Sequence, residues 1–275
     1  MIVLGGSSRQ SLAALRVALD NSLKGVSAGD ASAISSDLFK ALVAIDSSTG
    51  LRRALTDSSR DSLSKSDLIS DLFKKSLGGP ALGLLANATA LRWSAPSGIA
   101  DAIEQIAVEA EATAANLSNS LDQVQSEIFT FSKLLIENPD LRTALSERSQ
   151  SAEAKQALIK SILGSKFSAS TNSLLAHSVE SRRARSIEKT IAAYSHAVTA
   201  RRNRVNAHIK SSIALSDGQA KKLADSLTKQ IGQPVHLNIE IDPSILGGIS
   251  IRFGDEVIDG TISNRLAEAS RALVS

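Results

Sequence analysis

The chain has 275 residues, a formal net charge of +3 at pH 7, 3% aromatic residues and no cysteine. The lack of cysteine excludes disulfides, thiolate metal sites and cysteine nucleophiles, and so small a net charge does not by itself indicate a polyanionic partner. No run of eighteen apolar residues occurs, so we expect no direct membrane insertion.

The chain opens with Met1-Ile2-Val3-Leu4-Gly5-Gly6-Ser7, which lacks both the GxGxxG fingerprint and the Gly-Lys-Ser/Thr of a phosphate loop. We therefore expect a loose terminus that leads into a helix. Leu12, Leu15 and Leu19 follow at helical spacing. Such a stripe is core by default, but in a bundle it can also form half of a groove for a partner helix.

An internal duplication is predicted in the first two-thirds of the chain, with an offset of ninety residues. Ser36-Asp37-Leu38-Phe39 matches Ser126-Glu127-Ile128-Phe129, and Leu51-Arg52-Arg53-Ala54-Leu55 matches Leu141-Arg142-Thr143-Ala144-Leu145. The repeats cover about residues 36–110 and 126–200, and each copy reads as several helices.

Between the copies, apolar residues spaced by three, four or seven predict one long helix from about Ile99 to near Glu137, which Pro139 ends. Ser64 and Ser151 are candidate N-caps of later helices. The helical bundle domain is expected to span residues 1–204.

Two arginine clusters, at residues 182–185 and 201–204, are the strongest alternative signal. They could bind phosphates, although no aromatic residues interleave and Glu180 and Glu188 lie beside the first cluster. A solvated face or an acidic protein partner is the simpler reading. His177, His196, His208 and His236 show no metal-ligand spacing, so structural roles are expected for them and no cofactor is indicated.

A change of period at Val205 predicts a small α/β module over residues 205–275. Val205, Ala207 and Ile209 alternate as a strand, and Ser216 with Gln219 forms a capping box for a helix. The rest of the module contains alternating strands, turn glycines, a return strand at Val257 and Ile258, and a closing amphipathic helix. We expect the overall order β-α-β-β-α. Its predicted turn residues are Gly247, Gly248, Gly254 and Asp255. The predicted fold is therefore mainly α, a duplicated helical bundle followed by this module.

Residues 241–266 read Ile-Asp-Pro-Ser-Ile-Leu-Gly-Gly-Ile-Ser-Ile-Arg-Phe-Gly-Asp-Glu-Val-Ile-Asp-Gly-Thr-Ile-Ser-Asn-Arg-Leu. This run resembles the C-terminal signature of the ATP synthase delta subunit family, which includes the mitochondrial oligomycin-sensitivity-conferring protein. The resemblance continues, with less specific motifs, back to the first helix. The chain departs from the usual family pattern in length, because most members lack some ninety of these residues.

The resemblance implies a non-catalytic stator subunit in the peripheral stalk of a rotary, proton-translocating ATP synthase, at the cytoplasmic face of the cell membrane. The implied partners are the N-terminal helix of an alpha subunit and the C-terminal region of a b-type stalk subunit, with no nucleic acid. The second copy is expected to contact the catalytic head. The expected groove for the alpha helix comprises Leu12, Leu15, Leu19, Leu174, Leu175 and Val179, and the expected stalk contacts are Ile249, Ile251, Ile262 and Leu266.

Two other classes of function remain open from the sequence. One is a nucleic-acid-associated helical protein that uses the arginine clusters, whose binding would weaken steeply with added salt. The other is an enzyme, although no acid–base or metal constellation indicates one.

Overall fold

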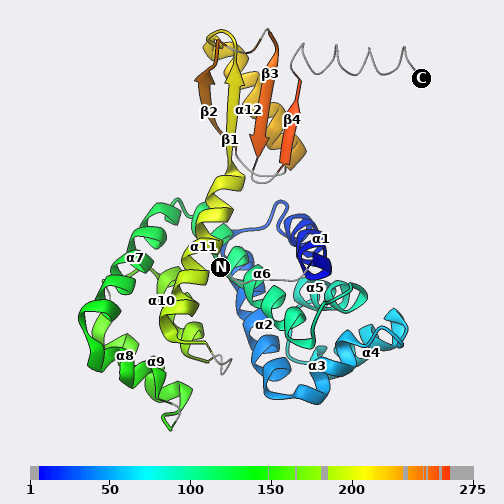
Figure 1. Ribbon diagram of the computed structural model, residues 1–275, viewed down its shortest axis with the longest axis vertical. Coiled ribbons are helices and arrows are strands. Elements are labelled where there is room, and N and C mark those ends of the chain that lie inside the picture. Colours follow the sequence, from blue (N-terminus) through cyan, green and yellow to red (C-terminus); the bar gives the residue numbers. More distant parts are fainter. Residues whose placement is uncertain are drawn as a thin grey trace. The chain divides into compact units, whose positions relative to one another are not determined.

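A computed structural model describes residues 6–147, 149–164, 166–180, 185–231, 235–243, 245, 247–253 and 256–260. The chain forms two compact units, Met1–Thr199 and Ala200–Ser275. The first is helical and the second holds a small sheet (Figure 1). The predicted fold class, mainly α with a C-terminal α/β module, is confirmed.

The first unit is built from helices only, within the described ranges. They are α1 (Gly6–Ser22), α2 (Ala28–Ser47), α3 (Thr49–Thr56), α4 (Ser62–Phe73), α5 (Gly79–Ala90), α6 (Pro96–Leu117), α7 (Leu121–Glu137), α8 (Pro139–Ser146), α9 (Ala152–Leu163), α10 (Ala169–Glu180) and α11 (Ile187–Val205). The last of these continues past Thr199 to Val205, so the helix ends where the sequence predicts the first strand.

The prediction of one long helix between the copies is wrong. The chain leaves the α conformation after Leu117 and resumes it at Leu121, and Asn119 lies between with a φ of 55°. Asparagine tolerates this left-handed conformation better than most residues with a side chain. The apolar spacing runs on through the break, and for this reason periodicity did not reveal it.

The helix bounds recur at the offset of ninety residues. Adding ninety to both bounds of α3, α4 and α5 gives the bounds of α8, α9 and α10, and adding ninety to the first residue of α1 gives the first residue of α6. Helix α6 thus ends one six-helix set, α1–α6, and begins the next, α6–α11. This recurrence supports the duplication.

A carboxylate cap recurs at the same offset. The backbone N–H of Gly78, before α5, donates to Asp37 Oδ2 at 2.8 Å. Ninety residues later, the N–H of Ser168, before α10, donates to both carboxylate oxygens of Glu127 at 3.0 Å. In both sets a carboxylate on the second helix therefore satisfies an N–H at the start of the fifth, where the helix dipole also favours negative charge.

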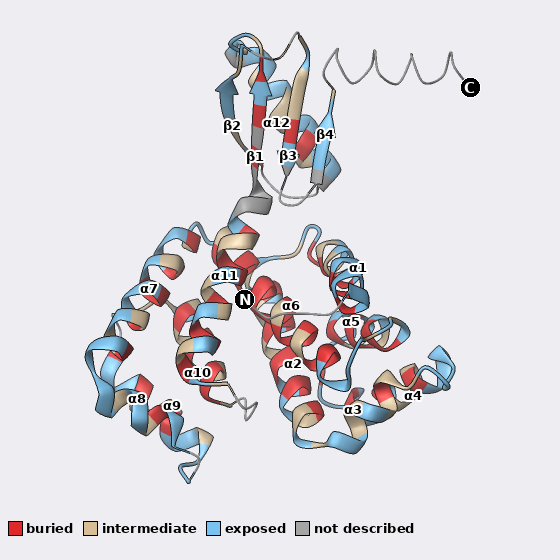
Figure 2. Cartoon of the chain, in the orientation of Figure 1, coloured by how far each residue is buried: buried red, intermediate tan, exposed pale blue. Residues whose placement is uncertain are grey.

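Helix α6 lies at the centre of the first unit, and nearly all of its residues from Gly98 to Ala115 are buried (Figure 2). It carries three buried carboxylates, each with a partner from another element. Arg16 forms an ion pair with Glu109 at 2.7 Å, Ser32 donates to Glu111 at 3.0 Å, and Arg185 pairs with Glu104. A buried carboxylate is tolerated in such a helix only when it pairs with a cation or accepts hydrogen bonds, as these three do.

The second unit contains β1 (Asn206–Ser211), α12 (Asp217–Ile231), β2 (His236–Ile241), β3 (Ile249–Phe253) and β4 (Glu256–Asp259). The sheet order is β2-β1-β3-β4, with β1 parallel to β2 and antiparallel to β3. Its core contains Ala207, Ile209, Leu227, Val235 and Ile251. Over the described residues the order is β-α-β-β-β, in which β4 contains the predicted return strand at Val257 and Ile258, and the predicted closing helix lies outside them.

None of the helices in the described ranges combines the length and the apolar character that crossing a membrane requires.

Candidate functional site

The six residues of the predicted helix groove are all buried in the core of the first unit: Leu12, Leu15, Leu19, Leu174, Leu175 and Val179. Helix α1 packs against α5 and α6, whereas α10 packs against α2, α6, α7 and α9. The structure therefore places the two halves of the predicted groove in different helix pairs. The reason is that α6 begins the second set and takes the place beside α10 that α1 has beside α5.

The α6–α10 pair carries another helix on its outer side, namely α2, which packs along α6 and contacts α10. The Ser35 hydroxyl donates to the carbonyl of Ala107 at 2.8 Å, and Ser32 donates to Glu111. The Phe39 ring stacks on the His177 ring with 4.1 Å between centroids and 11° between planes. The chain thus shows how an amphipathic helix docks on this kind of helix pair.

A cavity of about 290 Å³ opens beside the stack, lined by Phe39, Leu42, Val43, Asp46, Ser47, His177 and Glu180. Glu180 accepts hydrogen bonds from His177 at 2.6 Å and from Gln156 at 2.6 Å. Burial alone would raise the pKa of Glu180, but the hydrogen bond and charge of His177, together with Gln156, hold this pKa below its usual value. The carboxylate therefore stays ionised and fixes the imidazole over Phe39.

The α1–α5 pair has no such helix on its outer side among the described residues. The residues that correspond to Ala107, Glu111, His177 and Glu180, ninety positions earlier, are Val17, Asn21, Asn87 and Ala90. All four are exposed, and the Val17 side chain is 54% exposed. We call these four residues the α1–α5 face. It is an uncovered counterpart of the surface on which α2 docks.

The arginine clusters are in part structural. Arg185 pairs with the buried carboxylate of Glu104, to which the Tyr194 hydroxyl also donates at 3.3 Å. Arg201 is 2% exposed. Both guanidinium groups therefore face the protein interior, and this argues against a phosphate-binding surface. Arg182, Arg183 and Ala184 lie outside the described residues.

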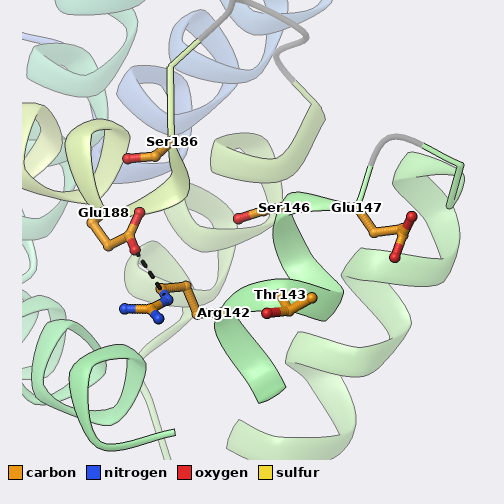
Figure 3. Close-up of a pocket in the computed structure, with 6 residues that line it drawn as sticks. All are labelled: Arg142, Thr143, Ser146, Glu147, Ser186 and Glu188. Carbon is orange, nitrogen blue, oxygen red and sulfur yellow. Dashed lines mark ion pairs between the residues drawn. The ribbon is translucent and has the colours of Figure 1, made fainter. Parts of the chain in front are cut away.

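A more open, polar pocket of about 400 Å³ lies between α8 and the start of α11 (Figure 3). Arg142 and Glu188 point toward each other across it and form an ion pair at 3.5 Å. Partial burial alone would raise the pKa of Glu188, but its own N–H, Ser186 and the Arg142 charge leave that pKa lowered. Arg142 and Glu188 thus neutralise each other across the pocket, and nothing in its lining selects a ligand.

Two of the four predicted stalk contacts, Ile249 and Ile251, lie in β3 of the second unit. Ile251 is buried and Ile249 is half-buried, so both belong mainly to the core. Exposed apolar side chains lie instead on the edge strands, at Ile241 in β2 and at Val257 and Ile258 in β4. Ile262 and Leu266 lie outside the described residues.

The predicted glycine turn joins β2 to β3. Gly247 and Gly248 have φ values of 145° and 85°, conformations that residues with a Cβ rarely adopt. The second predicted turn, Gly254-Asp255, lies outside the described residues. In the described ranges, no group of three or more histidine, cysteine, aspartate or glutamate side chains is arranged to hold a metal ion.

Comparison with known proteins gives a consistent result. The family described as ATP synthase delta (OSCP) subunit matches residues 108–273. The chain is 36% identical over 270 residues to the ATP synthase subunit delta of Streptomyces griseus subsp. griseus, covering 98% of this chain and 99% of that one. It is 37% identical over 270 residues to the Streptomyces coelicolor subunit and 35% identical over 268 residues to the Thermobifida fusca subunit, with 98% of both chains covered in each case. These relatives share the long form.

Proposed function

The chain belongs to the ATP synthase delta (OSCP) subunit family, a family of structural, non-catalytic subunits, and from this premise we propose that it links the alpha subunits of the catalytic head to the b-type helices of the peripheral stalk. Its place is at the cytoplasmic face of the membrane, as part of a proton-translocating complex. The link keeps the head from turning with the rotor. It acts by binding alone and uses no cofactor.

We assign the N-terminal helix of an alpha subunit to the α1–α5 face. The supporting observation is the docking of α2 on the corresponding α6–α10 pair, which uses a hydroxyl-to-carbonyl bond and an aromatic stack. Because α2 covers the second copy at this place, the first copy offers the open surface. The assignment therefore moves from the second copy, which the sequence favoured, to the first.

The second unit is the proposed contact for the b-type subunit. Its edge strands expose Ile241, Val257 and Ile258, while the core side chains Ile209 and Ile251 hold the strands in register. A partner helix that packs on these edge residues would remove apolar surface from water. The helical unit is left free for the head.

Two separate contacts suit a stator because, within the assembled complex, each contact keeps the partner of the other contact close to its binding surface. When one contact opens, the second keeps the partners at high effective concentration, so rebinding precedes dissociation. A subunit that resists torque needs a long-lived complex with its partners and needs no catalytic turnover.

The assignment is tested by titrating the full chain with a synthetic peptide of the alpha subunit's N-terminal helix in a calorimeter. Val17→Asp places a charge on the α1–α5 face and should weaken binding at least about tenfold, or roughly 1.4 kcal/mol. Leu63→Asp is the control, because Leu63 is 77% exposed on α4, a helix that contributes no residue to the face. Equal affinity of both variants and the native chain would show that the helix binds elsewhere.

A further inference from the structure

The outer side of α7 carries an apolar and basic stripe without a covering element among the described residues. Phe129 is 57% exposed, Ile136 is 69% exposed, and Lys133 lies between them in the sequence and is also exposed. The Lys133 ammonium lies 4.8 Å from the centre of the Phe129 ring, over its face. The spacing of four and then three residues places all three side chains on one side of the helix.

The same positions in α2 lie beside α10. Phe39, Val43 and Asp46, ninety residues earlier, line the cavity between α2 and α10. There the Phe39 ring is 2% exposed because His177 of α10 stacks on it. In the first copy, α10 of the next copy therefore covers the Phe39 end of this side of the second helix, whereas Val43 is 45% exposed.

No third copy follows in the chain, since α11 leads into β1. We propose that the stripe of Phe129, Lys133 and Ile136 is a docking surface for an amphipathic helix of another subunit. That helix takes the place on α7 that α10 takes on α2. This surface is distinct from the α1–α5 face and does not depend on what binds there.

The substitutions between the two copies define the chemistry of the occupant. Lys133 stands in α7 where α2 has Val43, so a cation replaces an apolar side chain. Ile136 stands where α2 has Asp46, so the anion of α2 is missing from α7. On α10 the stacked imidazole of His177 is followed three residues later by the carboxylate of Glu180. A helix with a ring that stacks on Phe129 and an acidic side chain one turn away that pairs with Lys133 would match both features.

The test is photo-cross-linking in the assembled, purified ATP synthase, with p-benzoylphenylalanine introduced at position 129 of the full chain. The matched control carries the same group at position 63, on the exposed Leu63 of α4. Position 129 should link to one other subunit, at a helical segment with Asp or Glu within about four residues of the linked site, and position 63 should not. Lys133→Glu, added to the position-129 variant, should lower the yield at least about tenfold, whereas Lys133→Arg should preserve it.

Three outcomes would overturn the proposal. Position 129 could link no more than position 63, Lys133→Glu could leave the yield unchanged, or the product could be a dimer of this chain. The dimer would assign the surface to a second copy instead. Phe129 is exposed, so the substitutions should leave the circular dichroism melt of the free chain unchanged. Peptide binding at Val17 gives an independent readout, so failure here is distinguishable from failure of the α1–α5 assignment.

Discussion

At the scale of single residues, buried carboxylates join helices that lie far apart in the sequence. Glu127 on α7 accepts hydrogen bonds from the Ser168 N–H, from the Ser168 hydroxyl at 2.7 Å and from the Thr171 hydroxyl at 2.6 Å. Burial alone would raise the pKa of Glu127, but these hydrogen bonds together hold it below its usual value. The ionised form is thus the one that the fold stabilises.

The pH dependence of stability follows from the sign of this shift. Because the pKa of Glu127 is lower in the folded than in the unfolded state, its contribution is present above the unfolded pKa of about 4.3 and is lost as the pH falls through the folded value. Glu127→Gln should therefore lower the free energy of unfolding by about 1–3 kcal/mol at pH 7, and by less as the pH approaches 4 and below. Urea unfolding at both pH values measures this.

The control is Glu137→Gln, at an exposed carboxylate that ends the same helix. It should change stability little at either pH. If Glu127→Gln lowered the free energy of unfolding by the same amount in acid as at pH 7, the shape of the side chain and not its charge would make the contribution.

Some local signals at this scale were readable from the sequence. Ser151 caps α9 as predicted, and Ser216 and Gln219 form the predicted reciprocal capping box. Ser64 is not a cap, because Asp61 accepts the hydrogen bond from its N–H and α4 starts at Ser62. Either side chain can cap, so the sequence did not select the correct one. The long-range cap by Glu127 is set by tertiary packing and leaves no local signal.

At the scale of helices, the sharing of α6 between the two sets is the main feature. The matching apolar residues at the ninety-residue offset indicated a repeat, but they did not show that one helix serves both copies. Leu12 and Leu174 each lie on an apolar stripe, and periodicity alone does not tell which stripes meet. For this reason the sequence paired α1 with α10, whereas the structure pairs α1 with α5.

The break between α6 and α7 provides a test at the same scale. Asn119 has a φ of 55°, a conformation that costs a β-branched residue about 1–2 kcal/mol. Asn119→Val should lower the free energy of unfolding by this amount, while Asn119→Gly should be neutral or slightly stabilising. Thermal melts of the two variants and the native chain measure the difference. An Asn119→Val variant as stable as the glycine variant would mean that the two helices join without strain.

At the scale of the whole molecule, the duplication predicts that one repeat length can be removed. Deleting residues 40–129 joins Phe39 to Thr130 at equivalent positions of α2 and α7, so one hybrid helix results. The remaining helices form one six-helix set in which α1 replaces α6 beside α10. We expect a cooperative thermal melt and a helical spectrum. A chain that is unfolded or aggregated would show that the two copies do not fold as equivalent sets.

In the proposed arrangement one unit holds the head and the other holds the stalk, and a chain that ends at Val205 separates the two roles. This end point keeps all of α11 and removes the whole sheet, which begins at Asn206. Binding of this chain to the alpha-subunit peptide and to a purified b-type C-terminal fragment is measured beside the full chain. We expect unchanged affinity for the peptide and an affinity for the b-type fragment lowered at least about a hundredfold, or roughly 2.7 kcal/mol. The division of roles is wrong if the shortened chain binds the b-type fragment at full affinity. It is also wrong if the shortened chain melts cooperatively but no longer binds the peptide.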